Sequence, residues 1–198
     1  MKNIVIDNNK SPNFIGCWNI DNKSLCMDIT KFFDENPQMQ SKGATLSGIN
    51  ESIQKAKDIT IKPLSLNDPK FSIFNDYIEY LNQCFINYKD QYPFTKSFLK
   101  KVHIGPFVIK KYISGDHFDH VHAERMGIKG IHRVFAWMTY LNDVNEGGTT
   151  DFPHYDIKVK PEIGKTLIWP AEWTHAHKGS IVKSESKYII TGWIHFAS

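Results

Sequence analysis

The sequence has little cysteine, and its three cysteines lie far apart. Cys17, Cys26 and Cys84 do not form the closely spaced pairs that are typical of a structural zinc site, and their number is odd. This pattern argues against a disulfide framework as the basis of the fold. We expect three reduced, buried thiols and a cytoplasmic protein.

Long apolar runs and clusters of one charge sign are also missing. No stretch approaches the roughly 20 apolar residues that cross a bilayer, and the first residues, MKNIVIDNNKSPN, are too polar for a secretory signal. The formal net charge is only +3, and lysine and arginine are spread through the chain. These features argue against a membrane protein. They also argue against nucleic acid as the partner, because its binding usually requires a concentrated basic surface.

The sequence contains no internal repeat and no low-complexity block. Hydrophobic residues make up 41% of the chain and charged residues 23%, which are ordinary values for a folded protein. A length of 198 residues leaves little room for two domains. We predict one domain over residues 1–198, in which residues 1–100 supply mainly helical support and outer strands and residues 101–198 form a β-rich core.

Hydrophobic periodicity predicts two helices in the first half of the chain. Apolar residues recur at helical spacing over residues 25–33, until Asn36 and Pro37 end the run, and again over residues 71–85. Around these helices, the sequence predicts a strand at residues 13–20, a loop or marginal helix at 38–58 and a strand at 59–61.

From Val102 onward, the pattern changes to short β-rich runs separated by Gly, Pro, Asn and Asp. Helices followed by many short strands indicate an α+β fold that is mainly β, with a β-sandwich or jelly roll supported by N-terminal helices. The predicted strands are residues 107–113, 134–141, 155–159, 166–169 and 188–196.

Histidine is concentrated in one short segment of the second half. Three histidines and two acidic residues fall within residues 117–124, and His175 and His177 follow further along the chain. Side chains two residues apart on a strand share a face, so a His-x-acid pair can offer two ligands to one metal ion. A distant histidine on a facing strand would complete a set of two histidines and one carboxylate, which is the pattern typical of non-haem iron(II).

The alternation of side chains along a strand divides this segment into two alternative ligand sets. His117 and Asp119 share one face, whereas His120, His122 and Glu124 share the other. The segment alone does not decide between the two faces.

Other short motifs recur around this segment in a specific order and spacing. They are Tyr112 ten residues before His122, RVFAWMTYLNDV from Arg133, EGGTTDFP from Glu146, and His177-Lys-Gly followed by Lys187. With these motifs, the stretch from Tyr112 to Trp193 resembles the prolyl 4-hydroxylase and oxygen-sensing prolyl hydroxylase families, and especially their small viral and bacterial relatives. The resemblance implies a double-stranded β-helix, or jelly roll, as the catalytic core.

The resemblance also implies that His122, Glu124 and His177 bind Fe(II) and are the catalytic residues. In the family, the first ligand follows a tyrosine that contacts 2-oxoglutarate by nine or ten residues, as His122 follows Tyr112, and the last ligand is a histidine followed by x-Gly. Glu124 departs from the aspartate that is common in the family, but it offers the same charge and donor atoms. The alternative ligand set is His117, Asp119 and His177.

The same resemblance implies residues that bind the cosubstrate 2-oxoglutarate. A Lys or Arg nine or ten residues after the last ligand binds its far carboxylate in the family, and Lys187 lies ten residues after His177. A buried lysine without an anionic partner would be unfavourable, which supports this role. The other expected contacts are Tyr112, Tyr140, Thr191 and Trp193, although the alternation at 188–193 equally fits a plain half-buried strand.

The function that the resemblance implies is an Fe(II)- and 2-oxoglutarate-dependent dioxygenase. It would use O2, with ascorbate as reductant, and would hydroxylate a C–H bond, with a prolyl residue of a peptide or protein as the leading substrate and a small molecule behind it. Arg125, Glu172 and Trp173 are candidates for reading the substrate at the mouth of the site, and Arg133 is expected to hold the fold by hydrogen bonding. The sequence does not indicate an oligomeric state.

Two other functions compete with this one. A zinc hydrolase could use the same ligands, but no HExxH helix is present and Lys187 would have no role. A catalytically silent jelly-roll module that binds metal or ligand is the second alternative.

Overall fold

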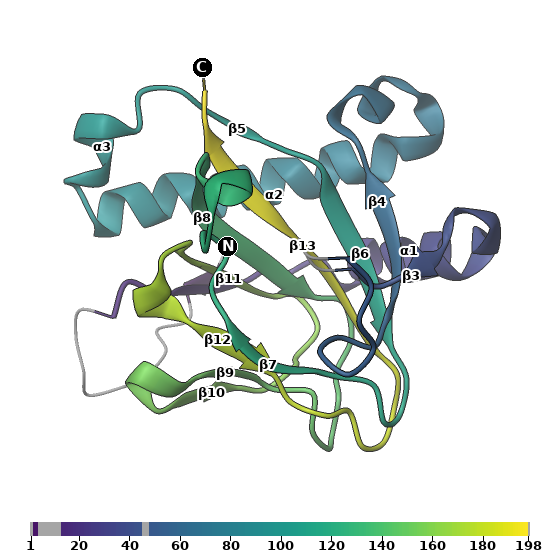
Figure 1. Cartoon of the computed structure of the whole chain (residues 1–198). Helices are drawn as coiled ribbons and strands as arrows, with labels where there is room; N and C mark the ends of the chain where they lie inside the picture. The colour runs from purple at the N-terminus through teal and green to yellow at the C-terminus, as the bar shows by residue number, and fades with distance from the viewer. Residues whose placement is uncertain (1, 4–12, 45–47, 198) are drawn as a thin grey trace.

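The computed structural model describes residues 2–3, 13–44 and 48–197 of the chain (Figure 1). Within these residues, the strands form one large sheet and one small sheet. The strand order in the large sheet is β1-β2-β11-β8-β13-β6-β4-β3, with β5 also paired to β13, and the order in the small sheet is β10-β9-β12-β7.

The large sheet contains the longer strands of the second half together with short strands from the first half (Figure 1). Its strands are β1 (Lys2–Asn3), β2 (Gly16–Asn19), β3 (Ser41–Lys42), β4 (Lys57–Ile61), β5 (Val102–Ile104), β6 (Phe107–Tyr112), β8 (Arg133–Tyr140), β11 (Lys165–Pro170) and β13 (Lys187–Phe196). The strands of the small sheet are β7 (Phe118–His122), β9 (Thr150–Phe152), β10 (Ile157–Val159) and β12 (His177–Gly179).

Two long helices come from the first half of the chain. The helices are α1 (Lys23–Glu35), α2 (Ser72–Gln91) and the short α3 (Thr95–Phe98). At the start of α1, the Asn22 side chain accepts a hydrogen bond from the Leu25 amide at 3.1 Å, which satisfies one of the free N–H groups of the first turn. At its end, the Asn36 side chain donates to the Phe32 carbonyl at 2.8 Å, and Pro37 follows. Single turns of 3₁₀-helix lie at Pro37–Met39, Pro63–Asn67, Pro69–Phe71, Ile128–Gly130, Pro153–Tyr155 and Trp173–His175.

The large sheet is buried on both faces because its side chains alternate between two hydrophobic clusters. On β8 and β13, Trp137 and Ile190 pack with the buried faces of α1 and α2. Their neighbours Met138 and Ile189 belong to the other cluster, which includes Phe152 of the small sheet. The two sheets therefore face each other across one core, while the helices support the outer face of the large sheet (Figure 1).

The structure confirms both predicted helices and a mainly β second half. The strand predicted at residues 155–159 begins only at Ile157, because Pro153–Tyr155 forms a 3₁₀ turn and Asp156 adopts a left-handed backbone with φ of 55°. The loop predicted at 38–58 contains the short strand β3, and part of that prediction, residues 45–47, lies outside the described residues. The three cysteines are buried, as predicted. No helix in the described ranges has the length and apolar character needed to span a membrane.

Candidate metal centre

The small sheet brings the two histidines of the candidate site together. His122 ends β7 and His177 begins β12, and the two residues are directly paired across these antiparallel strands. Glu124 follows β7 by two residues. Among the described residues, His122, Glu124 and His177 are the one group of His, Cys, Asp or Glu side chains that could hold a metal ion, with ligand atoms within 4.8 Å of one another.

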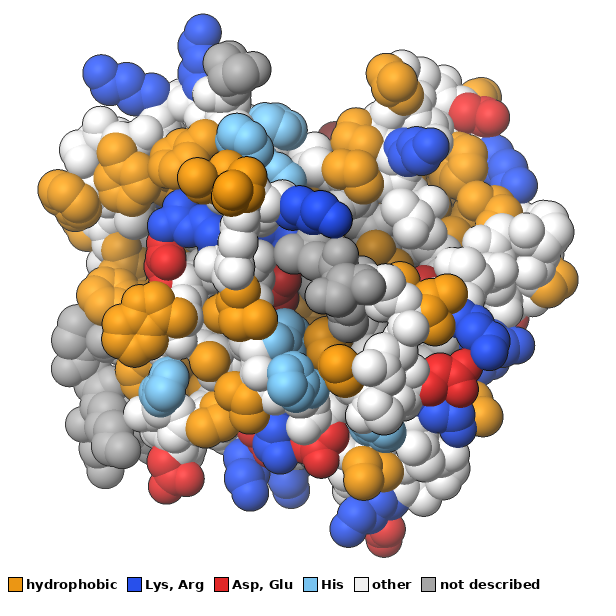
Figure 2. Space-filling view, viewed as in Figure 1, with side chains coloured by type: hydrophobic (Ala, Val, Ile, Leu, Met, Phe, Trp, Pro, Cys, Tyr) orange, Lys and Arg blue, Asp and Glu red, His pale blue; other side chains and the backbone are white. Residues whose placement is uncertain are grey.

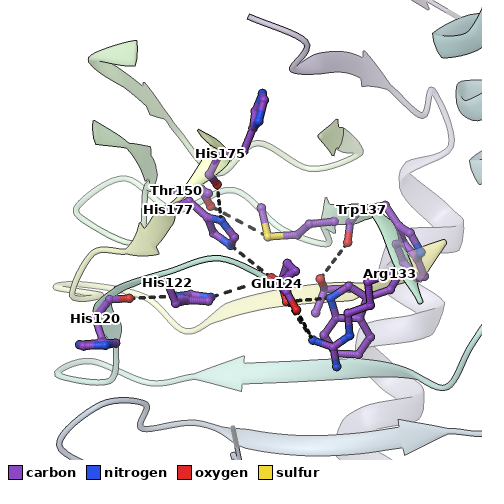
Figure 3. A network of polar contacts seen from close by, with 11 residues as sticks. His120, His122, Glu124, Arg133, Trp137, Thr150, His175 and His177 are labelled. Carbon is purple, nitrogen blue, oxygen red and sulfur yellow. Dashed lines mark hydrogen bonds and ion pairs between the residues drawn. The ribbon is translucent and has the colours of Figure 1, made fainter. Parts of the chain in front are cut away.

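Both imidazole rings are oriented by the chain itself. The Nδ1 of His122 lies 2.8 Å from the carbonyl oxygen of His120, and the Nδ1 of His177 lies 3.0 Å from the carbonyl oxygen of His175. A carbonyl oxygen only accepts hydrogen bonds, so each Nδ1 carries the proton and each Nε2 has a free lone pair. The two Nε2 atoms lie 3.9 and 3.4 Å from Oε1 of Glu124 (Figure 3). Two nitrogen donors and one carboxylate oxygen thus face a common point.

The second carboxylate oxygen of Glu124 is held by the large sheet. Its Oε2 accepts a hydrogen bond from Nε1 of Trp193 on β13 at 2.7 Å. Arg133, at the start of β8, donates to the main-chain oxygen of Glu124 at 3.0 Å and lies 3.5 Å from Oε2 (Figure 3). The Arg133 guanidinium also stacks on the Trp193 ring at 3.6 Å from its centre. These contacts fix the longer glutamate side chain, and they agree with the structural role predicted for Arg133.

The electrostatics of the group favour the protonation states that a metal requires. Burial, together with the neighbouring His177, lowers the pKa of His122 to about 4, although the charge of Glu124 acts in the opposite direction. Burial alone would raise the pKa of Glu124, but the hydrogen bond and charge of His177, together with His122 and Trp193, lower it to about 2. At neutral pH His122 is therefore neutral and Glu124 is ionised, which is the state in which both can bind a metal cation. This donor set fits Fe(II), for which two histidines and one carboxylate are a typical ligand set.

The ligand group opens into a cavity of about 420 Å³, within the usual size range of small-molecule sites. Figure 2 shows histidine side chains beside a recess on this face, between hydrophobic and basic side chains. Lys187 of β13 lines the same cavity although only 3% of it is exposed. Its Nζ donates to the Gly148 carbonyl at 2.9 Å and lies 4.6 Å from the centre of the Tyr112 ring.

Lys187 has the properties of an anion-binding residue. Burial lowers its pKa to about 8, although the charge of Asp151 acts in the opposite direction. No carboxylate in the described part of the chain forms an ion pair with it. A buried ammonium group of this kind is stabilised by a bound anion. The ligand group and Lys187 therefore fit a molecule that binds a metal at one end and presents a carboxylate at the other, as 2-oxoglutarate does.

The other predicted cosubstrate residues differ in their access to the cavity. Tyr112, Thr191 and Trp193 line it. Tyr140 does not, because it is fully buried and its hydroxyl group donates to Thr150 at 2.7 Å, with the Val159 carbonyl at 3.2 Å. A cosubstrate contact of Tyr140 stays a prediction. Thr150, which accepts this hydrogen bond and which the sequence did not indicate, lines the cavity itself.

The alternative ligands His117 and Asp119 have other partners. Asp119 forms an ion pair with Lys178 at 2.6 Å and is 43% exposed, and Nδ1 of His117 accepts a hydrogen bond from the Asp119 amide at 3.3 Å. His175 has its Nε2 at 2.7 Å from the carbonyl oxygen of Asn13. Within the described residues, the structure thus does not bring His117, Asp119 and His177 together as a ligand set.

The residues expected at the mouth of the site lie outside the cavity lining. Arg125 and Glu172 form an ion pair with each other, and Trp173 is 70% exposed. The cavity lining also contains an ion pair that the sequence did not indicate, between Asp58 of β4 and Lys110 of β6. The available signal was the position of Lys110 two residues before Tyr112, which places both on the same face of a strand.

The sequence of residues 107–195 matches the family model of the 2OG-Fe(II) oxygenase superfamily. The matched region extends from the start of β6 into the last part of β13 and includes all three candidate ligands. The chain thus carries 2OG-Fe(II) oxygenase sequence in its second half, as the resemblance predicted.

Solved prolyl hydroxylases share the fold. The viral collagen prolyl hydroxylase of Paramecium Bursaria Chlorella virus-1, solved with 2OG, has 18% sequence identity and a TM-score of 0.67, with 93% of this chain and 97% of that chain covered. A Pseudomonas putida prolyl-4-hydroxylase has 14% identity and a TM-score of 0.72, with coverage of 94% and 95%. A Trichoplax adhaerens prolyl hydroxylase, solved with a hypoxia inducible factor peptide fragment, has 16% identity and a TM-score of 0.71, with coverage of 93% and 84%. The chain is therefore prolyl hydroxylase-like in fold.

Curated relatives match shorter segments. Human prolyl 4-hydroxylase subunit alpha-1 is 27% identical over 70 residues, which are 32% of this chain and 13% of that protein. Probable prolyl 4-hydroxylase 9 of Arabidopsis thaliana is 28% identical over 122 residues, with 48% of this chain and 42% of that protein covered. The chain matches less than half the length of these relatives.

Proposed function

We propose that this protein is an Fe(II)- and 2-oxoglutarate-dependent dioxygenase that hydroxylates a prolyl residue of a peptide or protein and releases succinate and CO2. The observation that carries the proposal is the pairing, in one cavity, of a buried two-histidine, one-carboxylate group with the buried ammonium group of Lys187. Together the two features match a dicarboxylate that chelates a metal at one end and needs a cationic partner at the other.

The fold proposed for the catalytic core is a double-stranded β-helix. Two facing sheets with the candidate ligands on the small sheet and Lys187 on the large sheet support this assignment. The 2OG-Fe(II) oxygenase match over residues 107–195 covers the strands from β6 onward, which carry the candidate ligands and Lys187.

In this proposal, the residues of the chain hold and orient the reactants. His122, Glu124 and His177 hold the iron, while Trp193 and Arg133 keep the Glu124 carboxylate directed toward the two imidazoles. When bound, Fe(II) together with 2-oxoglutarate and O2 supplies the oxidising chemistry that converts a C–H bond to C–OH.

Other residues of the cavity lining bind the cosubstrate and exclude water. Lys187 pairs with the far carboxylate of 2-oxoglutarate, and Tyr112 packs against the lysine. Met138, Trp169 and Ile189 line the cavity with apolar surface, which excludes water from the reacting groups.

A peptide or protein substrate is supported by the similar proteins. The solved Trichoplax adhaerens structure contains a peptide fragment, and the sequence relatives are prolyl 4-hydroxylases. A small-molecule substrate is the alternative. Ascorbate as the reductant and a cytoplasmic location stay predictions.

Succinate formation tests the proposal. Purified protein with Fe(II), 2-oxoglutarate and ascorbate under air should form succinate, and proline-containing peptides should stimulate the reaction. His177→Ala should abolish turnover, and Lys187→Ala should raise the concentration of 2-oxoglutarate that is required. His103→Ala, which replaces an exposed histidine on β5, is the matched control and should leave turnover unchanged.

The two competing functions give different results in this assay. Iron-loaded parent protein that neither binds 2-oxoglutarate nor forms succinate would favour a silent binding module. Zinc-dependent hydrolysis without 2-oxoglutarate would favour the hydrolase.

A further inference from the structure

The cavity contains a second buried polar group, on the two strands that follow β13 in the large sheet. Asp58 on β4 and Lys110 on β6 are directly paired across these antiparallel strands. Nζ of Lys110 lies 2.6 Å from Oδ2 of Asp58, and the two residues are only 9% and 6% exposed. Both line the cavity that contains the candidate metal ligands.

This ion pair leaves hydrogen-bonding capacity unused. Oδ1 of Asp58 is buried and makes no hydrogen bond within the part of the chain that the structure describes. The side-chain nitrogen of Gln54, a residue that is 2% exposed and lines the same cavity, is likewise without a partner among the described residues. Buried polar atoms are rarely left unpaired, because each one loses its hydrogen bonds to water.

The ion pair alone does not offset the free-energy cost of removing the two charged groups from water. Burial raises the pKa of the Asp58 carboxyl, although the charge and hydrogen bond of Lys110 and, to a smaller extent, the nearby main-chain N–H group of Ala44 act to lower it. Ammonium groups have three N–H donors, and Asp58 takes one of those of Lys110. A ligand that supplied one donor and one acceptor would satisfy the atoms that are left.

The Asp58–Lys110 pair lies on a different side of the cavity from the proposed cosubstrate site. On the cavity face of the large sheet, Lys187 of β13 is paired with Tyr112 of β6, and Lys110 is paired with Ile189. Asp58 is one strand further away, so it lies roughly 10 Å from β13 at the usual strand spacing. A molecule bound between Lys187 and the metal ligands would leave the β4–β6 side of the cavity for a second molecule.

We infer that Asp58, Lys110 and Gln54 form a subsite that binds the main-chain polar groups of one amino-acid unit of the primary substrate. An N–H group of that unit donates to Oδ1 of Asp58, and its carbonyl or carboxylate oxygen accepts from Lys110 and Gln54. The inference rests on the proposed function, because it assigns the primary substrate to the side of the cavity that the cosubstrate leaves open.

The opposite charges of Asp58 and Lys110 favour a ligand without net charge. A ligand with a single charge would be attracted by one member of the Asp58–Lys110 pair and repelled by the other. A donor beside an acceptor, without net charge, complements both members. Peptide main chains and free amino acids share this arrangement, and the experiment distinguishes them.

Binding measurements test the subsite without requiring turnover. Zn(II) accepts two histidines and one carboxylate and has no redox chemistry, so the protein is loaded with Zn(II) and saturated with 2-oxoglutarate. Calorimetric titrations then use two probes, the capped peptide N-acetyl-Gly-Pro-Gly-amide and free L-proline. Tighter binding of the first indicates a peptide substrate, and tighter binding of the second indicates a free amino acid.

The decisive variant is Asp58→Leu/Lys110→Met, because replacing both members of a buried ion pair by apolar side chains usually preserves stability. We expect it to weaken binding of the preferred probe by about tenfold or more. Affinity for 2-oxoglutarate should stay within about twofold of the parent. Lys111→Met is the matched control on the same strand, since Lys111 pairs instead with Asp34 at 2.9 Å, and it should not change binding.

A single substitution that changes no charge tests the subsite even if the double variant does not fold. Gln54→Met should weaken binding of the same probe by about threefold to tenfold. Probe affinities unchanged in both variants, or no binding of either probe to the parent, would overturn the inference. If binding depends on the subsite but iron-loaded parent forms no succinate with the bound probe, the subsite stands and the proposed dioxygenase function fails.

Discussion

Lys187 combines a buried charge with a proposed role in binding 2-oxoglutarate, and its titration gives a prediction for pH dependence. Its pKa in the folded protein, about 8, lies below the usual value of 10.5 because burial disfavours the ammonium form. Only the ammonium form pairs with a carboxylate. We expect the dissociation constant of 2-oxoglutarate to be nearly constant below about pH 7.5 and to rise above pH 8 toward tenfold per pH unit.

Calorimetry on Zn(II)-loaded protein over this pH range measures that dependence. Lys187→Met should bind 2-oxoglutarate weakly at every pH and should lose the rise above pH 8. An affinity of the parent that stays constant to pH 9.5 would contradict the role of Lys187.

We expect the buried ammonium group of Lys187 to lower the stability of the ligand-free protein. Lowering its pKa from 10.5 to about 8 corresponds to a penalty of about 3 kcal/mol in the ligand-free protein below pH 8. The unfolded chain retains more protons between pH 8 and 10.5, so this penalty disappears as the pH rises through that window. Lys187→Met removes the penalty and loses the hydrogen bond to Gly148.

We therefore expect Lys187→Met to raise the free energy of unfolding of the ligand-free protein by about 1 to 2 kcal/mol at pH 7. Urea denaturation measures the change, with Lys111→Met as the control on the adjacent strand β6. A loss of stability would indicate that Lys187 has a structural role.

Trp193 is expected to determine how tightly the metal is bound, because it holds Oε2 of Glu124 at 2.7 Å. Trp193→Phe keeps an aromatic ring but removes this hydrogen bond. Loss of such a contact to a metal ligand typically lowers affinity by about 10-fold to 100-fold. Competition with a chelator for Zn(II) measures the effect, and Trp173→Phe, at a tryptophan that is 70% exposed, serves as the matched control. Equal affinities in the two variants would show that Glu124 does not need this support.

At the scale of elements, the sequence predicted those features that depend on local patterns. Helical spacing identified α1 and α2, and short β-rich runs between Gly, Pro, Asn and Asp identified β6, β8, β11 and β13. Alternation also placed His122 and Glu124 together on the opposite face from Asp119. In the structure, however, β7 ends at His122, and Glu124 is held by Trp193 and Arg133 of other strands.

Features that depend on pairing between distant segments could not be predicted in the same way. No local pattern indicates that β4 lies beside β6, so the Asp58–Lys110 pair was not expected. Tyr140 was assigned by its motif alone, and its fully buried hydroxyl group depends on the position of Thr150 in the other sheet. Register between strands decides both cases.

The close packing of β13 predicts a large effect of a small substitution. A Cβ atom added at Gly192 would lie 2.6 Å from the Trp137 ring and 2.8 Å from Cβ of Phe107. We expect Gly192→Ala to lower the free energy of unfolding by about 1 to 3 kcal/mol, because the neighbouring aromatic side chains must shift. Gly127→Ala, where no atom lies within 4 Å of the added Cβ, should change it by less than about 0.5 kcal/mol. Equal melting temperatures for the two variants would contradict this packing argument.

For the molecule as a whole, the candidate site joins the two sheets. Its histidines lie on β7 and β12 of the small sheet, while Trp193 and Lys187 belong to β13 of the large sheet. Ligands that bind only the folded protein stabilise it by about 2.7 kcal/mol at a concentration 100 times their dissociation constant. For a chain of this size, about 2 to 4 °C of melting temperature corresponds to each kcal/mol.

We therefore expect Zn(II) at about 100 times its dissociation constant to raise the melting temperature by about 5 to 10 °C. Adding 2-oxoglutarate should raise it further only when the metal is present, since the cosubstrate needs both the metal and Lys187. Glu124→Ala should lose both increases, whereas Lys187→Met should keep the first and lose the second. The same shift with 2-oxoglutarate in the absence of metal would mean that Lys187 binds the dicarboxylate without the ligand group, and the two ends of the cavity would then act independently.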